Sequence, residues 1–345
     1  MAILVTGGAG FVGVNVLEAL LEGGHDVVSF DATALPAAAA RVLAPYATRL
    51  HVESGSVLNA AALDALFGRH PIRQVIHAAA ITSGADRESR DPGSIIDVNL
   101  RGTLNVLEAA RRHDVSRAIY VGSGAAYGES LYRLPRLYEE TPSIPTTLYS
   151  ITKHAAERMC RRLRELWNID IVCVRLGTVI GPWERDTGAR DNFGTHSQLA
   201  ELALAGRTAV LTPREIQRDW IYSRVVEDAL VALLVTPSLS HTVYNLSSGV
   251  AWERPIERWC EALKRAYPDF TFRKAAGVEQ ANISYTDRDR GLMDVGRLVH
   301  DTGFRPSYVA EKAYGAYLDW LRRTPEFWVR NVRSREGGVH HDPTC

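Results

Sequence analysis

The sequence has no excess of charge of either sign, because Lys plus Arg and Asp plus Glu each number 40 in 345 residues. A protein that binds nucleic acid normally has a basic excess. The balance therefore argues against a nucleic-acid partner, while a local positive pocket for an anionic substrate stays possible. The chain also lacks any apolar run near the roughly 20 residues that a membrane-spanning helix needs. We therefore expect neither nucleic acid nor a membrane as partner.

Cysteine is scarce, and its four positions, Cys160, Cys173, Cys260 and Cys345, include no C-x-x-C pair and no metal-ligand spacing. Such scattered cysteines are typical of reduced thiols in a cytosolic protein, and no metal site is expected. The N-terminal stretch MAILVTGG has no basic segment before its apolar residues, so no signal peptide is expected. These absences predict a cytoplasmic protein.

What the sequence does contain is a repeated alternation of short Val- and Ile-rich runs with helical patterns. The expected strands span 2–7, 26–31, 74–80, 117–123 and 170–181, and the expected helices 11–24, 59–70, 99–113 and 149–166. This alternation is typical of a doubly wound parallel sheet with helices on both faces. The predicted fold is therefore α/β, of the Rossmann type.

After Gly181-Pro182 the pattern loosens, which predicts a smaller second lobe. A charged segment at 183–194 is expected to be a long loop, followed by helices at 195–206, 223–236, 256–267 and 308–323 and a strand at 241–248. We predict a main domain at 1–181, a mostly substrate-binding lobe at 182–324 with some segments returning to the main sheet, and a polar tail at 325–345. In that tail His340-His341 is not expected to bind metal.

The stretch TGGAGFVG follows the first expected strand and opens the first helix, with Gly7, Gly10 and Gly13 at G-x-x-G-x-x-G spacing. Glycine permits a tight turn with positive φ and a close approach of a diphosphate to a helix N-terminus. Phe11 and Val12 would line this turn. The strand–turn–helix context predicts a dinucleotide site.

The second expected strand ends at Asp31, eighteen residues past the last of these glycines. A carboxylate there can accept hydrogen bonds from the adenosine ribose hydroxyls and repels a 2′-phosphate. The residues that follow, Ala32, Thr33 and Ala34, offer no arginine for that phosphate. The cofactor is therefore predicted to be NAD rather than NADP. A helix-capping role for Asp31 is the alternative.

Tyr149 and Lys153 are four residues apart in an expected helix, so both side chains project from the same face. Such a pair can arise by chance on a helix surface. Alternatively, the cation favours the charged phenolate and makes Tyr149 a usable acid or base. The spacing alone does not decide between these interpretations.

The chain as a whole resembles the extended short-chain dehydrogenase/reductase superfamily, in its NAD-dependent epimerase/dehydratase family. The resemblance runs from Ile3 to about Leu321 and rests on eight motifs in the family's order. They are TGGAGFVG, VIHAAA, DVNLRGT, YVGSGAAYG, YSITK, VRLGTVIGP, RDWIY and YNLSSG.

This resemblance implies a catalytic set of Ser123, Tyr149 and Lys153, in which Tyr149 exchanges a proton with the substrate oxygen and Ser123 donates a hydrogen bond to it. The cofactor-binding residues it implies are Gly7, Gly10, Phe11, Val12, Gly13, Asp31, Ser56, Val57, Ala78, Ala79, Ala80, Asn99, Tyr149, Lys153, Leu176 and Thr178. Two of these depart from the family's usual pattern, because Ser56 replaces an acidic residue and Thr178 an asparagine.

The substrate-binding residues implied by the same resemblance are Thr82, Ser123, Asn192, Arg218 and Arg288, with Arg290 as an alternative to Arg288. The stretch Ser123-Gly124-Ala125 lacks the carboxylates with which some family members eliminate water, so a 4,6-dehydratase is not expected. An epimerase that inverts carbons next to a ketone needs a further acid–base pair. His154, Asp191 and His196 qualify by type only and are expected at the surface. The aromatic residues Trp183, Phe193 and Trp220 are either pocket or core, with core preferred.

Three functions are compatible with these residues. The preferred one is an NAD-dependent dehydrogenase or reductase that interconverts a secondary alcohol and a ketone on a sugar- or polyol-like substrate, because VLTPREIQ and YTDRDRG replace the family's usual diphosphate-binding stretches. The alternative is a nucleotide-sugar 4-epimerase similar to UDP-glucose 4-epimerase, which keeps its NAD. A non-catalytic NAD-binding regulator is disfavoured by the complete Ser/Tyr/Lys set. The resemblance also implies a homodimer.

Overall fold

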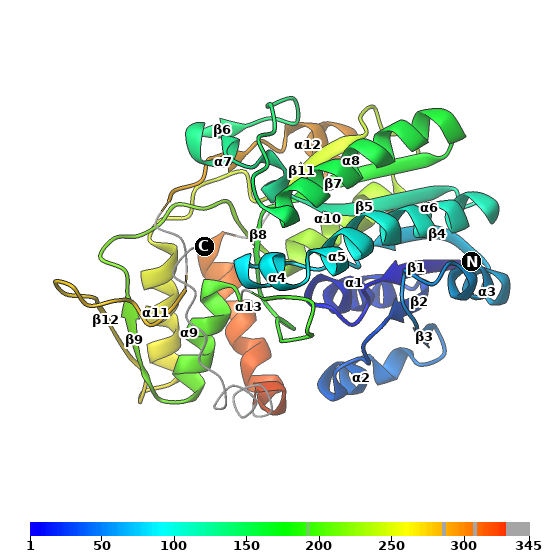
Figure 1. Ribbon diagram of the computed structural model, residues 1–345. Helices are drawn as coiled ribbons and strands as arrows, with labels where there is room; N and C mark the ends of the chain where they lie inside the picture. The colour runs from blue at the N-terminus through cyan, green and yellow to red at the C-terminus, as the bar shows by residue number, and fades with distance from the viewer. Residues whose placement is uncertain (192, 285–287, 306–308, 329–345) are drawn as a thin grey trace.

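A computed structural model of the chain describes all residues except 192, 285–287, 306–308 and 329–345 (Figure 1). The first half forms a sheet flanked by helices, and most of the second half forms a smaller lobe beside it (Figure 1). Within the described residues, no helix combines the length and the apolar character that crossing a bilayer requires.

The central element is a seven-stranded parallel sheet with the strand order β11-β7-β5-β4-β1-β2-β3. Its strands are β1 (Ala2–Thr6), β2 (Asp26–Asp31), β3 (Leu50–Ser54), β4 (Ile72–His77), β5 (Arg117–Ser123), β7 (Asp170–Leu176) and β11 (Val243–Leu246). The chain winds outward from β1 in one direction and from β4 in the other, so the switch point lies between these two strands. In open α/β sheets the crevice outside the carboxyl ends of the strands at this point binds ligands. The predicted fold class is confirmed.

Helices cover both faces of the sheet, because each face is lined by apolar side chains that must be buried. One face packs against α1 (Phe11–Glu22) and α10 (Ser223–Val235), and the other against α3 (Ala60–Arg69), α6 (Thr103–Arg112) and α8 (Leu148–Trp167). Shorter helical elements connect them. They are α2 (Ala37–Leu43), η1 (Ala44–Tyr46), α4 (Ala85–Arg90), α5 (Pro92–Ile96), the π-helical turn η2 (Asp97–Gly102), η3 (Gly124–Tyr127) and α7 (Ser130–Arg133).

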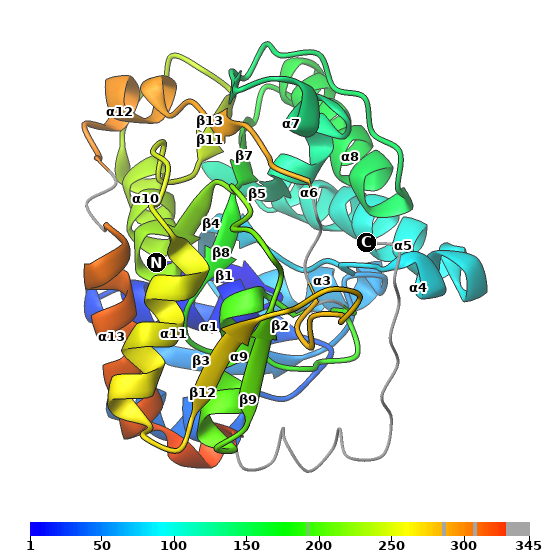
Figure 2. The same cartoon turned by 90° about the vertical axis from the view of Figure 1, so that its left-hand side faces the viewer.

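The second lobe combines helices with small two-stranded sheets (Figure 2). Its helices α9 (Thr195–Leu204), α11 (Pro255–Ala266) and α13 (Ala310–Arg323) pack together around Trp259 and Tyr317. The strand pairs are β8 (Thr178–Ile180) with β10 (Trp220–Tyr222), β9 (Thr208–Leu211) with β12 (Thr271–Lys274), and β6 (Arg136–Leu137) with β13 (Leu292–Met293). Helix α12 (Gly296–Thr302) packs against β11 at the edge of the main sheet.

Two expectations from the sequence need correction. The single strand expected over 170–181 is two strands, because the chain leaves the main sheet at Gly177 and β8 pairs with β10 instead. The polar tail expected from residue 325 does not begin there, because Phe327 and Trp328 are buried with exposed fractions of 5% and 2%. Their rings pack against Trp320 of α13. The dipeptide His340-His341 lies outside the described residues.

Candidate active site

The Gly-rich turn between β1 and α1 leaves no room for side chains at two of its glycines. Gly7 has a φ of +71°, and a Cβ atom there would lie 2.6 Å from the Ala79 nitrogen in the loop after β4. A Cβ atom at Gly13 would lie 2.0 Å from the Gly7 carbonyl oxygen. Gly7 thus allows the turn to pass against the residues 78–80, and Gly13 allows α1 to pack onto the turn.

Gly10 has a different role, because it is the N-cap of α1 and has no side chain to occupy the helix end. A Cβ atom there would meet only the Gly7 carbonyl oxygen within 4 Å, at 3.2 Å. The backbone N–H groups of the first turn, which includes Phe11 and Val12, have no capping side chain. An uncapped helix N-terminus suits a diphosphate.

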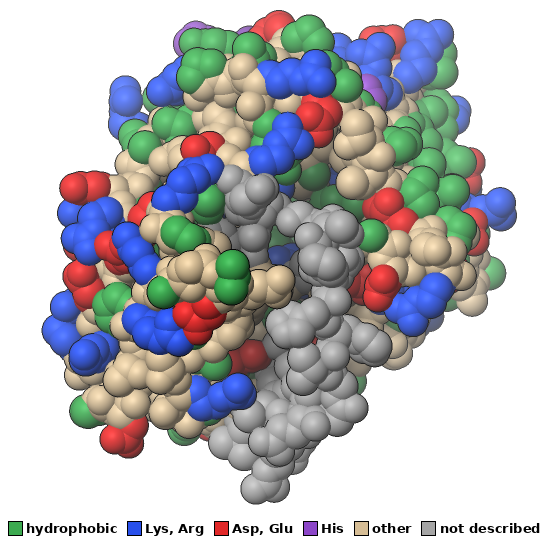
Figure 3. All heavy atoms as spheres, turned by 60° about the vertical axis from the view of Figure 1, so that its left-hand side comes forward, with side chains coloured by type: hydrophobic (Ala, Val, Ile, Leu, Met, Phe, Trp, Pro, Cys, Tyr) green, Lys and Arg blue, Asp and Glu red, His purple; other side chains and the backbone are tan. Residues whose placement is uncertain are grey.

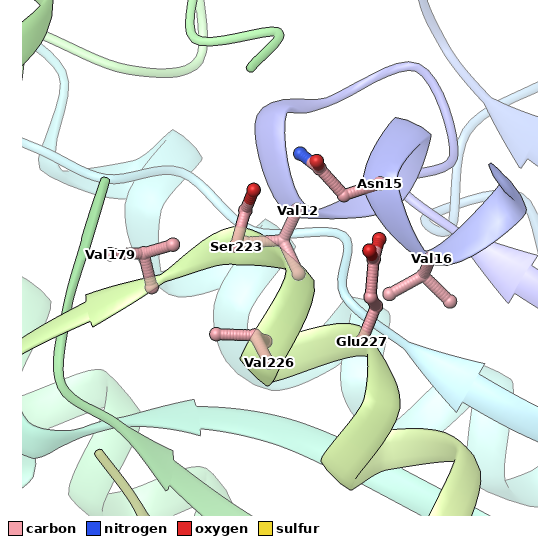
Figure 4. A pocket seen from close by; sticks show the side chains of 7 residues that line it. All are labelled: Val12, Asn15, Val16, Val179, Ser223, Val226 and Glu227. Carbon is pink, nitrogen blue, oxygen red and sulfur yellow. The ribbon is translucent and has the colours of Figure 1, made fainter. Parts of the chain in front are cut away.

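Helix α1 packs against α10 (Figure 4). Val12, Asn15 and Val16 of α1 face Ser223, Val226 and Glu227 of α10 across a small crevice that Val179 also lines (Figure 4). The Asn15 amide donates to the Phe11 and Pro182 carbonyl oxygens at 2.8 and 3.0 Å. Burial raises the pKa of Glu227, whose Oε1 lies 2.7 Å from the Arg224 Nε. The turn that is predicted to hold the cofactor is therefore supported by a helix from the second half of the chain.

Asp31, at the carboxyl end of β2, faces this turn. Its Oδ2 accepts a hydrogen bond from the Ala9 nitrogen at 3.0 Å, and its Oδ1 accepts from the Thr33 nitrogen at 2.8 Å and the Thr33 hydroxyl at 2.9 Å. The carboxylate is thereby fixed beside the turn, as an adenosine-ribose partner requires. Farther along the same edge, Val57 is buried and the Ser56 hydroxyl accepts from the Leu58 nitrogen at 3.2 Å.

Helix α8 places Tyr149 in its first turn. A capping box starts the helix, in which the Thr147 hydroxyl accepts from the Ser150 nitrogen and the Ser150 hydroxyl accepts from the Thr147 nitrogen, at 3.2 and 3.0 Å. The Tyr149 nitrogen donates to the Glu88 carboxylate at 3.2 Å. The position of the phenol therefore depends on a helix start that the local sequence encodes.

Lys153 lies one turn farther along α8 and is almost fully buried, with an exposed fraction of 4%. Its Nζ donates to the Val121 carbonyl oxygen at 3.0 Å and lies 6.0 Å from the centre of the Tyr149 ring. Burial lowers the pKa of Lys153, and the Tyr149 phenol is the main influence that opposes this effect. The hydrogen bond to Val121 ties the ammonium to the carboxyl end of β5.

Ser123 ends the same strand, two residues after Val121. Its hydroxyl accepts from the Ala125 nitrogen at 3.1 Å and caps η3. The predicted catalytic residues therefore come from the end of β5 and from the first two turns of α8, which pack against each other. The Ser123 hydroxyl, the Tyr149 phenol and the Lys153 ammonium thus belong to two elements that are in direct contact.

Asn99 is buried in the π-helical turn η2. Its Oδ1 accepts from the Ile81 nitrogen at 2.8 Å, and its Nδ2 donates to the Ile81 carbonyl oxygen at 3.0 Å and to the Thr152 hydroxyl at 3.1 Å. These bonds connect the loop after β4 to α8. Such π-turns occur frequently at functional sites. The helix expected over 99–113 begins as a regular α-helix only at Thr103.

His77 was not among the site residues predicted from the sequence. It lies beside the hydrogen bonds that Asn99 makes. Its Nδ1 is 2.6 Å from the Thr6 hydroxyl and its Nε2 is 2.9 Å from the Thr103 hydroxyl. Burial lowers the pKa of His77 to about 3, and the Lys153 charge adds to this effect. The only hint in the sequence is a polar residue at the end of an apolar strand.

Leu176 and Thr178 flank the point where the chain leaves the main sheet. The Thr178 hydroxyl lies 3.4 Å from the Asp219 Oδ1, and a Cβ atom at Gly177 would lie 2.7 Å from the Asp219 carbonyl oxygen. Burial raises the pKa of Asp219 to about 6, although the nearby charges of Arg290 and Arg218 lower it. Asp219 is a buried acid next to the predicted nicotinamide loop, and the motif RDWIY is the feature of the sequence that contains it.

Two arginines from different segments meet near Asp219. Arg218 is 6% exposed, and its pKa is lowered first by burial and then by the charge of Arg290. The Arg290 Nη2 donates to the Tyr132 hydroxyl at 3.3 Å. Arg288 instead forms an ion pair with Glu129, at 2.9 Å between its Nη2 and the Glu129 Oε2, and is half exposed. Among the predicted arginines, Arg290 lies beside Arg218, because the Arg290 nitrogen donates to the Gln217 carbonyl oxygen at 2.9 Å.

The remaining predicted residues have varied positions. Asn192 lies outside the described residues, and the Thr82 backbone pairs with the segment around Arg190. His196 was expected at the surface, but this is wrong, because it is fully buried next to Trp220 and Tyr314. Trp183 and Trp220 belong to the core, whereas His154, Asp191 and Phe193 are half-buried.

Comparison with known proteins gives one family. The family model described as "NAD dependent epimerase/dehydratase family" matches residues 3–247. A dTDP-glucose 4,6-dehydratase of Xanthomonas campestris pv. campestris is 26% identical over 351 residues, which cover 95% of each chain. A UDP-glucose 4-epimerase of Halalkalibacterium halodurans is 35% identical over 181 residues, which cover 52% of each chain.

The fold is shared with solved structures. The UDP-glucose 4-epimerase of Thermus thermophilus, solved with NAD, matches with a TM-score of 0.73 at 25% identity and covers 93% of this chain and 99% of its own. The Bifidobacterium longum enzyme of the same name, solved with NAD⁺ and UDP, matches with a TM-score of 0.77 at 22% identity, over 94% of this chain and 99% of its own. These similarities extend over both lobes.

Proposed function

Because the chain belongs to the NAD-dependent epimerase/dehydratase family, we propose that it is a nucleotide-sugar 4-epimerase that retains its NAD. It is an enzyme of this family and NAD is its cofactor. The expectation of a dehydrogenase for a free sugar or polyol is less well supported, because the similar enzymes act on nucleotide-linked sugars by their names. The alternative drawn from the sequence is therefore preferred.

The observation that carries the proposal is the pairing of Arg218 with Arg290. The Arg290 nitrogen donates to the Gln217 carbonyl oxygen at 2.9 Å, so this arginine lies beside Arg218, which is 6% exposed. Two neighbouring guanidinium groups favour the binding of an anion. The diphosphate of a nucleotide sugar supplies that anion, and guanidinium groups suit phosphate oxygens. A free sugar or polyol has no such charge. This site thus supports a nucleotide-linked substrate despite the changed sequence around it.

In the proposed reaction, Tyr149 takes the proton of the substrate hydroxyl as that carbon is oxidised to a ketone, and returns it when the ketone is reduced on its opposite face. Lys153 holds a positive charge beside the phenol, and Ser123 donates a hydrogen bond to the oxygen where negative charge develops. Bound NAD supplies the hydride acceptor and donor. The substrate is oxidised and then reduced, so no net change in NAD occurs.

The loop after Ser123 supports epimerisation over loss of water. Elimination needs an acid and a base near the carbons that lose hydrogen and hydroxyl, but the turn η3 consists of Gly124, Ala125, Ala126 and Tyr127. The next carboxylate, Glu129, forms an ion pair with Arg288. Ser123, which caps this turn, offers a hydroxyl, whereas the turn itself contains no carboxylate.

The test is to incubate the purified protein with UDP-glucose or dTDP-glucose without added cofactor and to follow the sugar by NMR. A 4-epimerase converts the substrate into its galactose isomer with no build-up of reduced nicotinamide. A dehydrogenase instead needs added NAD and forms NADH in proportion to product, and a dehydratase forms a 4-keto-6-deoxy sugar. Either of these two outcomes would overturn the proposal.

A further inference from the structure

The segment of residues 183–191, which we call the strap, crosses the carboxyl edge of the main sheet at its switch point. It starts at Trp183, whose indole N–H donates to the Glu18 carboxylate of α1 at 3.0 Å and whose ring packs against Trp320. It ends at Asp191, which contacts the loop after β4 and α4. The strap therefore links the elements that follow β1 and β4, the two strands between which a dinucleotide binds.

Two arginines of the strap reach the Gly-rich turn. The Arg185 Nη2 donates to the carbonyl oxygens of Ala9 and Ala34, at 3.1 and 3.3 Å. The Arg190 guanidinium lies 5.7 Å from the centre of the Phe11 ring, in the first turn of α1. The first contact lies on the side of Asp31 and the second at the helix N-terminus that suits a diphosphate.

Ion pairing and backbone hydrogen bonds fix the other end of the strap. The Arg87 guanidinium holds the Asp191 carboxylate with its Nε and Nη2 at 2.6 to 2.9 Å, and its Nη2 also donates to the Gly188 carbonyl oxygen at 2.7 Å. The Thr82 nitrogen donates to the Ala189 carbonyl oxygen at 2.8 Å, and the Asp191 nitrogen donates to the Thr82 carbonyl oxygen at 3.0 Å. The Arg87–Asp191 ion pair joins α4 to the strap, and we call this pair the latch.

Each of the two arginines retains an unused donor. Among the described residues, the Nε atoms of Arg185 and Arg190 are buried and have no hydrogen-bond partner. The Arg190 Nη2 forms an ion pair with the buried Glu184 at 2.6 Å, which fixes the direction of the guanidinium. A buried donor without a partner is unfavourable and is normally satisfied by a ligand or water. Here the adjacent turn is the predicted site of a diphosphate.

We propose that the strap is a further part of the cofactor site, in which Arg190 donates to the NAD diphosphate and the Arg87–Asp191 latch closes the strap over the bound dinucleotide. Release of NAD then requires the latch to open. This explains how the enzyme retains its cofactor through an oxidation and a reduction. The proposal rests on NAD binding at the Gly-rich turn and is independent of which sugar is the substrate.

The latch is tested by the rate of cofactor release. Protein loaded with NADH is mixed with excess NAD, and the loss of NADH fluorescence gives the dissociation rate constant. Arg87→Ala and Asp191→Asn are each expected to raise this rate constant about tenfold or more, since each breaks a charge-assisted bond. The double variant is expected to release NADH no faster than the quicker single variant, because both changes break one interaction.

Arg112→Ala is the matched control, because Arg112 forms an ion pair with Asp64, 2.9 Å from its Nη2, outside the crevice. Its release rate should equal that of the unchanged protein. Thermal unfolding of each variant checks folding, and Asp191→Asn keeps the side-chain shape if Arg87→Ala is unstable. Equal release rates in all folded variants would overturn the latch. Failure of the protein to bind NAD at all would overturn the cofactor assignment itself.

The role of Arg190 is tested by comparing NAD with adenosine, which lacks the diphosphate. Arg190→Met is made in a Glu184→Gln background, so that no buried carboxylate loses its partner, and is compared with Glu184→Gln alone. The additional change is expected to weaken NAD binding about tenfold or more and to leave adenosine binding unchanged, as measured by calorimetry. Equal weakening of both ligands would show a purely structural role.

Discussion

At the residue scale, the predicted site depends on how Tyr149 and Lys153 are held. The Lys153 ammonium is buried and fixed to the Val121 carbonyl oxygen, and Tyr149 lies in the first turn of the same helix. Burial lowers the pKa of Lys153, and the neighbouring Tyr149 side chain is the main influence that opposes this effect. We therefore infer that these two side chains act as a unit.

Tyr149→Phe is expected to lower the turnover number about a hundredfold or more, because general acid–base catalysis contributes this much. NAD binding should be nearly unchanged, since only the phenol oxygen is removed. Turnover and the NAD dissociation constant are measured together, with Tyr46→Phe, in η1, as a control. Full turnover in Tyr149→Phe would contradict a proton-transfer role.

Asp31→Ala is expected to raise the affinity for NADP relative to NAD by about tenfold or more, because a carboxylate close to a 2′-phosphate costs several kcal/mol. The neighbouring Arg185 strengthens this expectation. Burial lowers the pKa of Arg185, and the charge of Asp31 is the largest influence that opposes this effect. Asp26→Ala, at the exposed start of the same strand, is the control. An unchanged ratio of the two dissociation constants would mean that Asp31 only orders the turn.

At the element scale, α8 connects the catalytic residues to the sheet. Glu157 lies one turn after Lys153, and its carboxylate accepts two hydrogen bonds from Arg175 of β7, at 2.6 Å from the Nε and 2.7 Å from the Nη2. Arg175 also donates to the Glu139 carbonyl oxygen at 3.1 Å. One buried ion pair thus fixes the helix that presents Tyr149.

Glu157→Gln is expected to lower the free energy of unfolding by about 3–5 kcal/mol, because it leaves the buried Arg175 charge without its partner. Urea unfolding measures the loss. Glu165→Gln breaks an exposed ion pair with Arg162 on the same helix and should leave the free energy of unfolding nearly unchanged. Equal stability of the two variants would contradict this role for the Arg175–Glu157 pair.

At the scale of the whole molecule, positive and negative charges are balanced in number. On the face shown in Figure 3, basic and acidic side chains are interspersed and form no large area of one sign. The cationic groups relevant to the proposals, Arg185, Arg190, Arg218 and Arg290, belong to segments that follow the main domain. The tertiary structure brings them to the edges of the crevice, so a neutral chain provides local sites for anions.

Two histidines buried in separate lobes should make the stability of the molecule depend on pH. Burial lowers the pKa of His77 and of His196 to about 3 each. Below the ordinary histidine pKa of 6.5, these histidines bind protons in the unfolded chain but not in the folded chain. The free energy of unfolding therefore falls as the pH decreases. At pH 5 this costs about 2 kcal/mol for each histidine. Asp219 opposes part of the effect, because its pKa is raised.

His196→Phe is therefore expected to reduce the loss of stability between pH 7.5 and pH 5 by about 2 kcal/mol, since a phenylalanine fits the aromatic surroundings and does not titrate. Urea unfolding at both pH values provides the measurement. His51→Phe, at an exposed position, is the control and should show the dependence of the unchanged protein. The same loss of stability between the two pH values in all three proteins would contradict the lowered pKa of His196.

Most of the main sheet could be predicted because its strands are continuous apolar runs. The strands at 26–31 and 117–123 have the predicted bounds, and the neighbouring helices differ by one or a few residues. The edge strand β3 was missed because its residues are mainly exposed and its only apolar residues are Leu50 and Val52. The two strands β7 and β8 were predicted as a single strand over 170–181, because nothing in the apolar pattern marks the change of partner at Gly177.

The sequence by itself determined the sheet, the glycine turn and the Tyr149/Lys153 pair, because periodic burial and local backbone geometry are encoded in consecutive residues. Only the tertiary structure decided that Arg290 joins Arg218, that His196 is buried, and that Arg87 holds Asp191 104 positions away. These contacts join residues that are far apart in the sequence. No local pattern specifies which distant charges will meet.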